Sequence, residues 1–118
     1  MAELDDFVRV ADVADVPPGK LKQVDVEGMT LVVGNDEGDL FALSGWCSHE
    51  GSELRLGTLQ DHVLTCFAHQ WTYNVKTGDP IWPPLARVAP GYRLRTYRVR
   101  VEGDAILVSR KPARLGLG

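Results

Sequence analysis

Cys47-Ser48-His49, followed 16 residues later by Cys66-Phe67-Ala68-His69, is the part of this 118-residue chain that decides its fold. The two segments contain both cysteines of the chain and two of its three histidines. Two such pairs of thiolate and imidazole ligands can hold one metal centre between two loops. The spacing therefore predicts a metal site with the ligands Cys47, His49, Cys66 and His69.

The pairing of the ligands favours an iron–sulfur cluster over zinc. A structural zinc site usually begins with two cysteines separated by about two to four residues and ends with two histidines separated by about three to five. Here each segment supplies one cysteine and one histidine. This arrangement suits a binuclear cluster in which one iron binds two cysteines and the other binds two histidines. A structural zinc-binding module is the alternative from a different class of protein.

The residues around these ligands resemble the Rieske ferredoxin family across roughly residues 40–80, with weaker likeness out to about Val108. The resemblance implies one Rieske [2Fe-2S] cluster and no catalytic residue. It also implies an all-β Rieske fold, an antiparallel β-sandwich with a small cluster-binding subdomain over about residues 45–84. Two loops and a proline loop form that subdomain in the family. The segment from Pro80 to Pro84 lies in the place of the proline loop, although it could also be a rigid connector.

Positions beside the ligands predict a low reduction potential. High-potential Rieske proteins have two further cysteines, at positions that match Ser52 and Ala68, and a serine hydroxyl at the position that matches Trp71. Their disulfide braces the cluster loops, and a hydroxyl hydrogen bond to sulfur stabilises the reduced form. The charges of Glu50 and Glu53 also disfavour the addition of an electron. We therefore expect a potential near the low end of the Rieske range of about −150 to +300 mV.

The segment from Cys66 to Tyr73 is similar to the ferredoxins of soluble di-iron monooxygenases, which oxidise toluene, alkenes or isoprene. Ferredoxins of ring-hydroxylating dioxygenases usually have proline after each ligand cysteine and glycine after the second histidine. This chain instead has Ser48, Phe67 and Gln70. The differences favour a monooxygenase component, although Ser48 also replaces a proline that is frequent in that group. A dioxygenase ferredoxin and other Rieske carriers, such as a nitrite-reductase small subunit, are the alternatives.

The resemblance implies a one-electron carrier that is not itself an enzyme. A flavin-containing NADH reductase would supply the electrons, and the di-iron hydroxylase of a monooxygenase in aromatic hydrocarbon catabolism would receive them. In Rieske proteins the histidine-bound iron lies nearest the surface, so the tip around His49 and His69 is the expected docking face. A carrier with two partners favours small, transient interfaces that are steered by charge.

The composition predicts one domain over residues 1–118. At this length and with 44% hydrophobic residues the chain can bury a modest core. The net charge of −3 and the scattered basic residues give no case for binding nucleic acid.

The expected setting is the cytoplasm. Both cysteines are assigned to the cluster, so none is left for a disulfide, as is usual in a reducing compartment. The segment from Met1 to Asp6 lacks the basic and apolar regions of a signal peptide. No apolar run approaches the roughly 18 residues that span a bilayer. We expect a monomer without a membrane partner.

Apolar residues recur at alternate positions or in short β-branched runs that turn residues separate, which predicts strands and no helix. A loose tail is expected over residues 110–118, which contain Pro112, Gly116 and Gly118. The expected strands are Phe7–Val10, Leu21–Val26, Met29–Val33, Leu40–Leu43, His62–Thr65, Trp71–Val75, Arg95–Val101 and Ala105–Val108.

Four further residues near the ligands need an interpretation. His62 has no partner at ligand spacing, so we expect a surface or strand residue. Trp46 and Trp71 adjoin the ligands, and such aromatic residues usually lie in the core. For Trp71 the second interpretation is a surface anchor that contacts the hydroxylase. Gly51 is expected to let backbone N–H groups approach the cluster sulfides.

Overall fold

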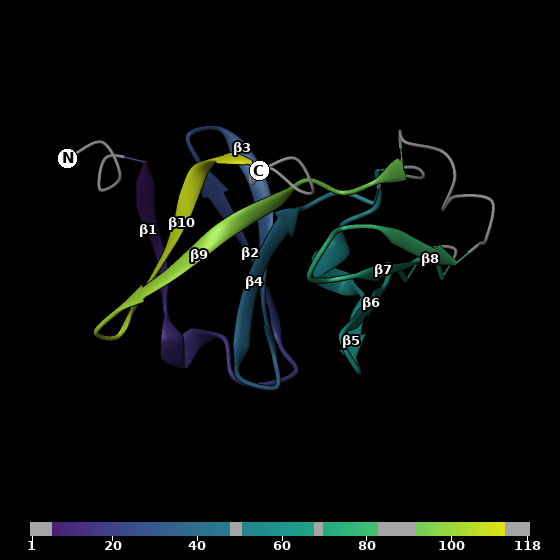
Figure 1. Ribbon diagram of the computed structural model, residues 1–118, viewed down its shortest axis with the longest axis horizontal. Coiled ribbons are helices and arrows are strands. Elements are labelled where there is room, and N and C mark those ends of the chain that lie inside the picture. Colours follow the sequence, from purple (N-terminus) through teal and green to yellow (C-terminus); the bar gives the residue numbers. More distant parts are fainter. Residues whose placement is uncertain (1–5, 48–50, 68–69, 83–91, 113–118) are drawn as a thin grey trace.

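The computed structural model describes residues 6–47, 51–67, 70–82 and 92–112, and in these ranges the chain forms two antiparallel sheets (Figure 1). The larger sheet has the strand order β1-β10-β9-β4-β3-β2, and the smaller sheet has the order β5-β6-β7-β8. The larger sheet contains β1 (Phe7–Asp12), β2 (Leu21–Val26), β3 (Met29–Asp36), β4 (Asp39–Ser44), β9 (Thr96–Glu102) and β10 (Ala105–Pro112). The smaller sheet contains β5 (Thr58–Gln60), β6 (Val63–Thr65), β7 (Thr72–Asn74) and β8 (Pro80–Trp82).

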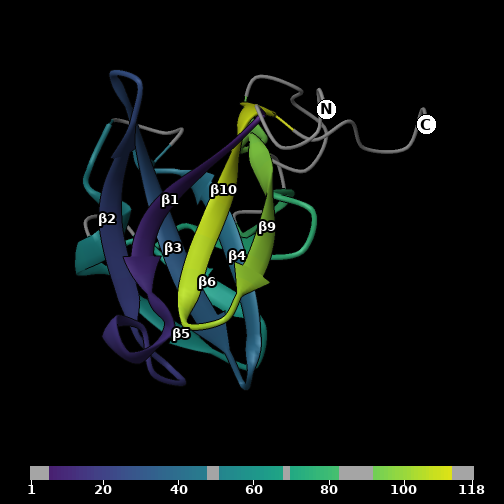
Figure 2. The same cartoon turned by 90° about the vertical axis from the view of Figure 1, so that its left-hand side faces the viewer.

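The larger sheet is curved, and β1 at one end of the strand order contacts β2 at the other (Figure 2). The curved sheet encloses its own core, to which Leu31, Val33 and Ala42 belong. Their neighbours Val32 and Leu43 belong to a second core, which also includes residues of the smaller sheet. Successive side chains of a strand point to opposite faces. The hairpin β3–β4 is therefore a wall shared by both cores.

The predicted all-β class and its antiparallel pairing are confirmed, while several strand ends differ. β2 has the predicted bounds, β3 and β10 are longer than predicted, and β9 is shifted by one residue. The strands β5 and β8 were not predicted, because β5 has only one apolar residue, Leu59, and β8 begins with a proline that indicated a loop. Two short 3-10 turns, η1 (Val13–Asp15) and η2 (Leu54–Leu56), complete the described elements.

The expected proline loop and tail both require correction in their described parts. Pro80 pairs with Tyr73 and Trp82 pairs with Thr72, so the beginning of the proline segment is an edge strand of the smaller sheet. Pro83 and Pro84 lie outside the described residues. The tail prediction is wrong for residues 110–112, because these continue β10. Residues 113–118 lie outside the described ranges. No described helix is long and apolar enough to cross a membrane.

Candidate metal centre

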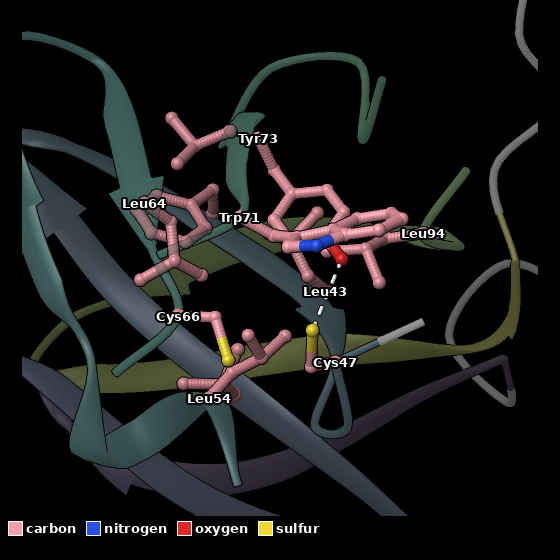
Figure 3. Close-up of a cluster of buried hydrophobic side chains, with 11 residues drawn as sticks. Leu43, Cys47, Leu54, Leu64, Cys66, Trp71, Tyr73 and Leu94 are labelled. Carbon is pink, nitrogen blue, oxygen red and sulfur yellow. Dashed lines mark hydrogen bonds between the residues drawn. The ribbon is translucent and has the colours of Figure 1, made fainter. Parts of the chain in front are cut away.

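The two cysteines of the predicted site are buried where the two sheets meet. Cys47 follows β4 of the larger sheet and Cys66 follows β6 of the smaller sheet. Neither cysteine is in a disulfide, and their exposed fractions are 3% and 1%. They belong to one cluster of buried side chains that includes Leu54, Leu64 and Trp71 (Figure 3). His49 and His69 lie outside the described residues, so the structure shows the cysteine half of the predicted ligand set.

The two cysteine loops are closed by the same main-chain hydrogen bonds. The Cys47 N–H donates to the carbonyl of Ser52 at 2.7 Å, and the Gly51 N–H donates to the carbonyl of Cys47 at 2.8 Å. In the second loop the Cys66 N–H donates to the carbonyl of Trp71 at 2.8 Å, and the Gln70 N–H donates to the carbonyl of Cys66 at 3.0 Å. Each thiol is therefore held at the base of a closed loop of the same design.

The matching positions Gly51 and Gln70 both have a left-handed backbone, with φ of +75° and +59°. A Cβ at Gly51 would meet nothing within 4 Å among the described residues. Glycine suits this left-handed conformation, because it has no Cβ. The expected approach of backbone N–H groups to the cluster sulfides stays a prediction. Gln70 has to adopt the same conformation with a side chain, which is unfavourable.

Tyr73 is a functional residue that the sequence analysis missed. Its side chain is fully buried on β7, and its hydroxyl oxygen lies 3.2 Å from Cys47 Sγ (Figure 3). A thiolate bound to a metal can only accept a hydrogen bond, so the tyrosine is then the donor. The sequence could have indicated this residue, because Tyr73 lies two positions after Trp71 and alternate residues of a strand share a face. With a cluster bound, this bond would stabilise the more negative, reduced state and would partly offset the absent serine hydroxyl.

The two tryptophans beside the ligands differ in burial: Trp46 is exposed and Trp71 is buried. Trp46 was expected in the core but is 45% exposed, because the neighbouring Cys47 takes the inward position. Trp71 is 9% exposed, and its ring packs edge-on against Tyr92 with the centroids 4.9 Å apart. The core interpretation of Trp71 is therefore correct, and its role as a surface anchor is not supported. Phe67, beside the other cysteine, is 55% exposed.

Two further residues have partners that the sequence did not indicate, although His62 is exposed as expected of a surface residue. Glu53 was expected to disfavour reduction, but its carboxylate accepts a hydrogen bond from Arg55 Nε at 2.9 Å. The paired charge therefore contributes less to the field at the thiols. His62 does not begin a strand; it lies in the turn before β6 with a left-handed φ of +67° and contacts Asp36. Glu50 lies outside the described residues.

Comparison with known proteins identifies the family. The model of the Rieske [2Fe-2S] domain matches residues 6–98, most of the chain. The chain therefore belongs to the Rieske [2Fe-2S] domain family and carries one cluster of that type.

Two of the similar proteins are ferredoxins from different kinds of oxygenase system. The chain is 33% identical to the biphenyl dioxygenase ferredoxin subunit of a Pseudomonas species over 110 residues, which cover 92% of this chain and 96% of the relative. It is 34% identical to the ferredoxin component of the alkene monooxygenase system of Xanthobacter autotrophicus over 114 residues. These residues cover 94% of this chain and 88% of the relative. These relatives are electron carriers and not catalytic subunits.

Solved structures agree with the sequence comparisons. The ferredoxin of carbazole 1,9a-dioxygenase from Nocardioides aromaticivorans has a TM-score of 0.80 and 32% identity, and the match covers 89% of this chain and 98% of the ferredoxin. A chain in the complex of reduced oxygenase and oxidised ferredoxin of carbazole 1,9a-dioxygenase has a TM-score of 0.81 and 26% identity. The match covers 92% of this chain and 97% of that chain. The similarity thus extends over nearly the whole chain in each case.

The hydrogen bond from Tyr73 gives a first prediction. Tyr73→Phe should lower the midpoint potential by roughly 20–60 mV, since a tenfold change in a one-electron equilibrium corresponds to about 59 mV. Voltammetry on protein with an intact visible spectrum measures this shift. Tyr97→Phe is the matched control, because its hydroxyl contacts Met29 and its ring lies in the other core. An unchanged potential in Tyr73→Phe would contradict the assignment.

The left-handed positions give a second prediction. Gln70→Gly should raise the free energy of unfolding by about 0.5–1 kcal/mol, because glycine adopts positive φ without a steric cost. Gly51→Gln should lower it by a similar amount. Gln60→Gly, in strand β5, is the control and should be destabilising. Thermal unfolding followed by circular dichroism separates these outcomes, and a loss of stability in Gln70→Gly would refute the argument.

Proposed function

We propose that this chain is the ferredoxin component of a multicomponent oxygenase system, a one-electron carrier and not an enzyme. The observation that carries the proposal is the pair of matched loops that hold two buried cysteines where the sheets meet. The family and the ferredoxin relatives from both kinds of oxygenase system support it.

The proposed ligands are Cys47 and Cys66 for one iron and His49 and His69 for the other. Two thiolates and two neutral imidazoles are the donor set of a Rieske centre. The bound cluster supplies reversible one-electron exchange. The chain's own contribution is to keep the two thiols dry, through the buried side chains of Leu54, Leu64 and Trp71 around them.

The proposed partners are a flavin-containing NADH reductase and an oxygenase, met in turn by a monomeric carrier. Phe67 and Gln70 favour the di-iron hydroxylase of a monooxygenase, as argued from the sequence. A ring-hydroxylating dioxygenase is the second candidate, because a dioxygenase ferredoxin is as similar to this chain as a monooxygenase ferredoxin is. Either partner fits a protein that binds no substrate itself.

The proposed docking face is the tip that carries the cysteine loops. Trp46 precedes one cysteine and Phe67 follows the other, and both expose large aromatic surfaces. Aromatic side chains of this kind are frequent anchors in protein interfaces. A small apolar face beside the ligands suits brief contact with two successive partners.

Replacement of the ligands tests the cluster assignment. Cys47→Ser and Cys66→Ser should abolish the visible spectrum and destabilise the fold, because metal binding contributes to folding energy. His49→Ala and His69→Ala should abolish the Rieske spectrum. His62→Gln should retain it, since that histidine is outside the proposed ligand set. Iron and sulfide analysis with EPR of the reduced protein checks these results, and a colourless wild-type protein that contains zinc would support the structural module.

An exposed aromatic residue tests the docking face. Phe67→Ser should keep the cluster and its potential but slow single-turnover electron transfer to the oxygenase by roughly tenfold, the effect of about 1.4 kcal/mol. Val101→Ser is the control, because Val101 is similarly exposed on the β9–β10 hairpin, at the opposite end from the smaller sheet (Figure 1). Assays with hydroxylases of both classes identify the partner. Equal rates for the two variants would remove Phe67 from the interface.

A further inference from the structure

A contact between the side chains of Asp36 and His62 joins the two sheets, and neither residue is a proposed ligand. Asp36 is the last residue of β3, and His62 lies in the turn between β5 and β6. The distance from His62 Nδ1 to Asp36 Oδ2 is 2.5 Å. The Asp36 side chain is only 3% exposed, whereas the imidazole is half exposed. The pair therefore connects a buried carboxylate of one sheet to a histidine of the other that solvent can reach.

A buried carboxylate is costly unless it is paired. Among the described residues, His62 is the one group that forms an ion pair with Asp36. The turn that presents His62 is tightly constrained, since Asp61 and His62 both have positive φ and the Val75 N–H donates to the His62 carbonyl at 3.2 Å. The imidazole is thus positioned by the backbone of the smaller sheet.

The position of the contact relates it to both cysteines. From the turn after Asp36, strand β4 leads toward Cys47; from His62, strand β6 leads toward Cys66. The Asp36–His62 pair therefore connects the beginnings of β4 and β6, the two strands that lead to the cysteines.

We propose that Asp36 and His62 form a proton-dependent latch between the two sheets, closed by an ionic pair while the imidazole is protonated and weakened when that proton is lost. The buried carboxylate is the fixed half of the latch. The half-exposed imidazole is the half that exchanges its proton with solvent.

The charges around His62 set the pH range. The hydrogen bond to Asp36, then the Asp36 charge, raises the pKa of His62 above its ordinary value of 6.5. Glu37 acts in the same direction, while partial burial and the Lys76 charge oppose it. A group whose pKa is raised by folding stabilises the fold fully below its unfolded pKa, and this stabilisation is lost as the pH rises through the folded value. The latch is therefore fully closed below pH 6.5 and weakens as the pH rises through the raised pKa of His62.

The test compares the cluster-loaded wild type with His62→Gln between about pH 5.5 and pH 9, which brackets the titration of histidine. The readouts are the thermal midpoint and the rate at which the visible absorbance bleaches. At the acid end His62→Gln should melt at a lower temperature and bleach several-fold faster than the wild type. The difference should shrink as the pH rises. A difference that is the same at every pH overturns the latch.

Two further variants sharpen the test. Lys76→Gln removes the opposing charge, so the difference between histidine and glutamine at position 62 should persist to higher pH. Asp36→Asn should remove the pH dependence; if it fails to fold, NMR titration of the His62 ring in the wild type decides instead. A pKa at or below 6.5 overturns the proposal.

A metal ion is the competing explanation for the same residues. Ligand atoms of Asp36, Glu37 and His62 lie within 4.8 Å of one another. If the difference between wild type and His62→Gln disappears on treatment with EDTA and returns with zinc, a metal and not a proton closes the contact, and the latch is wrong. The thermal and NMR readouts do not depend on the proposed electron-transfer function.

Discussion

The burial of two cysteines between two sheets is the constraint on which the rest of the structure depends. Cys47 belongs to a loop of the larger sheet and Cys66 to a loop of the smaller one, so neither sheet can hold the pair alone. Burial in an apolar cluster keeps water away from them. The repeated hydrogen-bond pattern of the loops supplies backbone groups of both cysteines with partners where the chain leaves β4 and β6.

The fold was predictable where side-chain alternation is long enough to be recognised. Strand β3 places Leu31 and Val33 in one core and Val32 in the other, and such a run is read directly as a strand with two buried faces. The ligand segments were equally predictable, because two cysteines and two histidines, both scarce in this chain, occur in two closely spaced pairs. Strands β5 and β8 were not, since β5 has a single apolar residue and β8 begins with Pro80.

The misjudged details of the site depend on which way a side chain points. Trp46 and Trp71 are both tryptophans beside a ligand loop, yet one is exposed and the other is buried. Their difference follows from the inward direction of Cys47 and from the position of Trp71 at the base of the second loop, against Tyr92. The Asp36–His62 contact joins residues distant in sequence and follows from tertiary packing alone.

Two polar contacts join the sheets across the shared wall of β3 and β4, and they lie toward its opposite ends. Tyr73 of the smaller sheet bonds Cys47 after the end of β4, while His62 of the smaller sheet bonds Asp36 at the end of β3, just before β4 begins. Apolar packing between them is non-directional and would allow the sheets to slide. Two directional contacts at separate points resist both sliding and rotation. The relative position of the cysteine loops is thus set by polar geometry, with the apolar core supplying the cohesion.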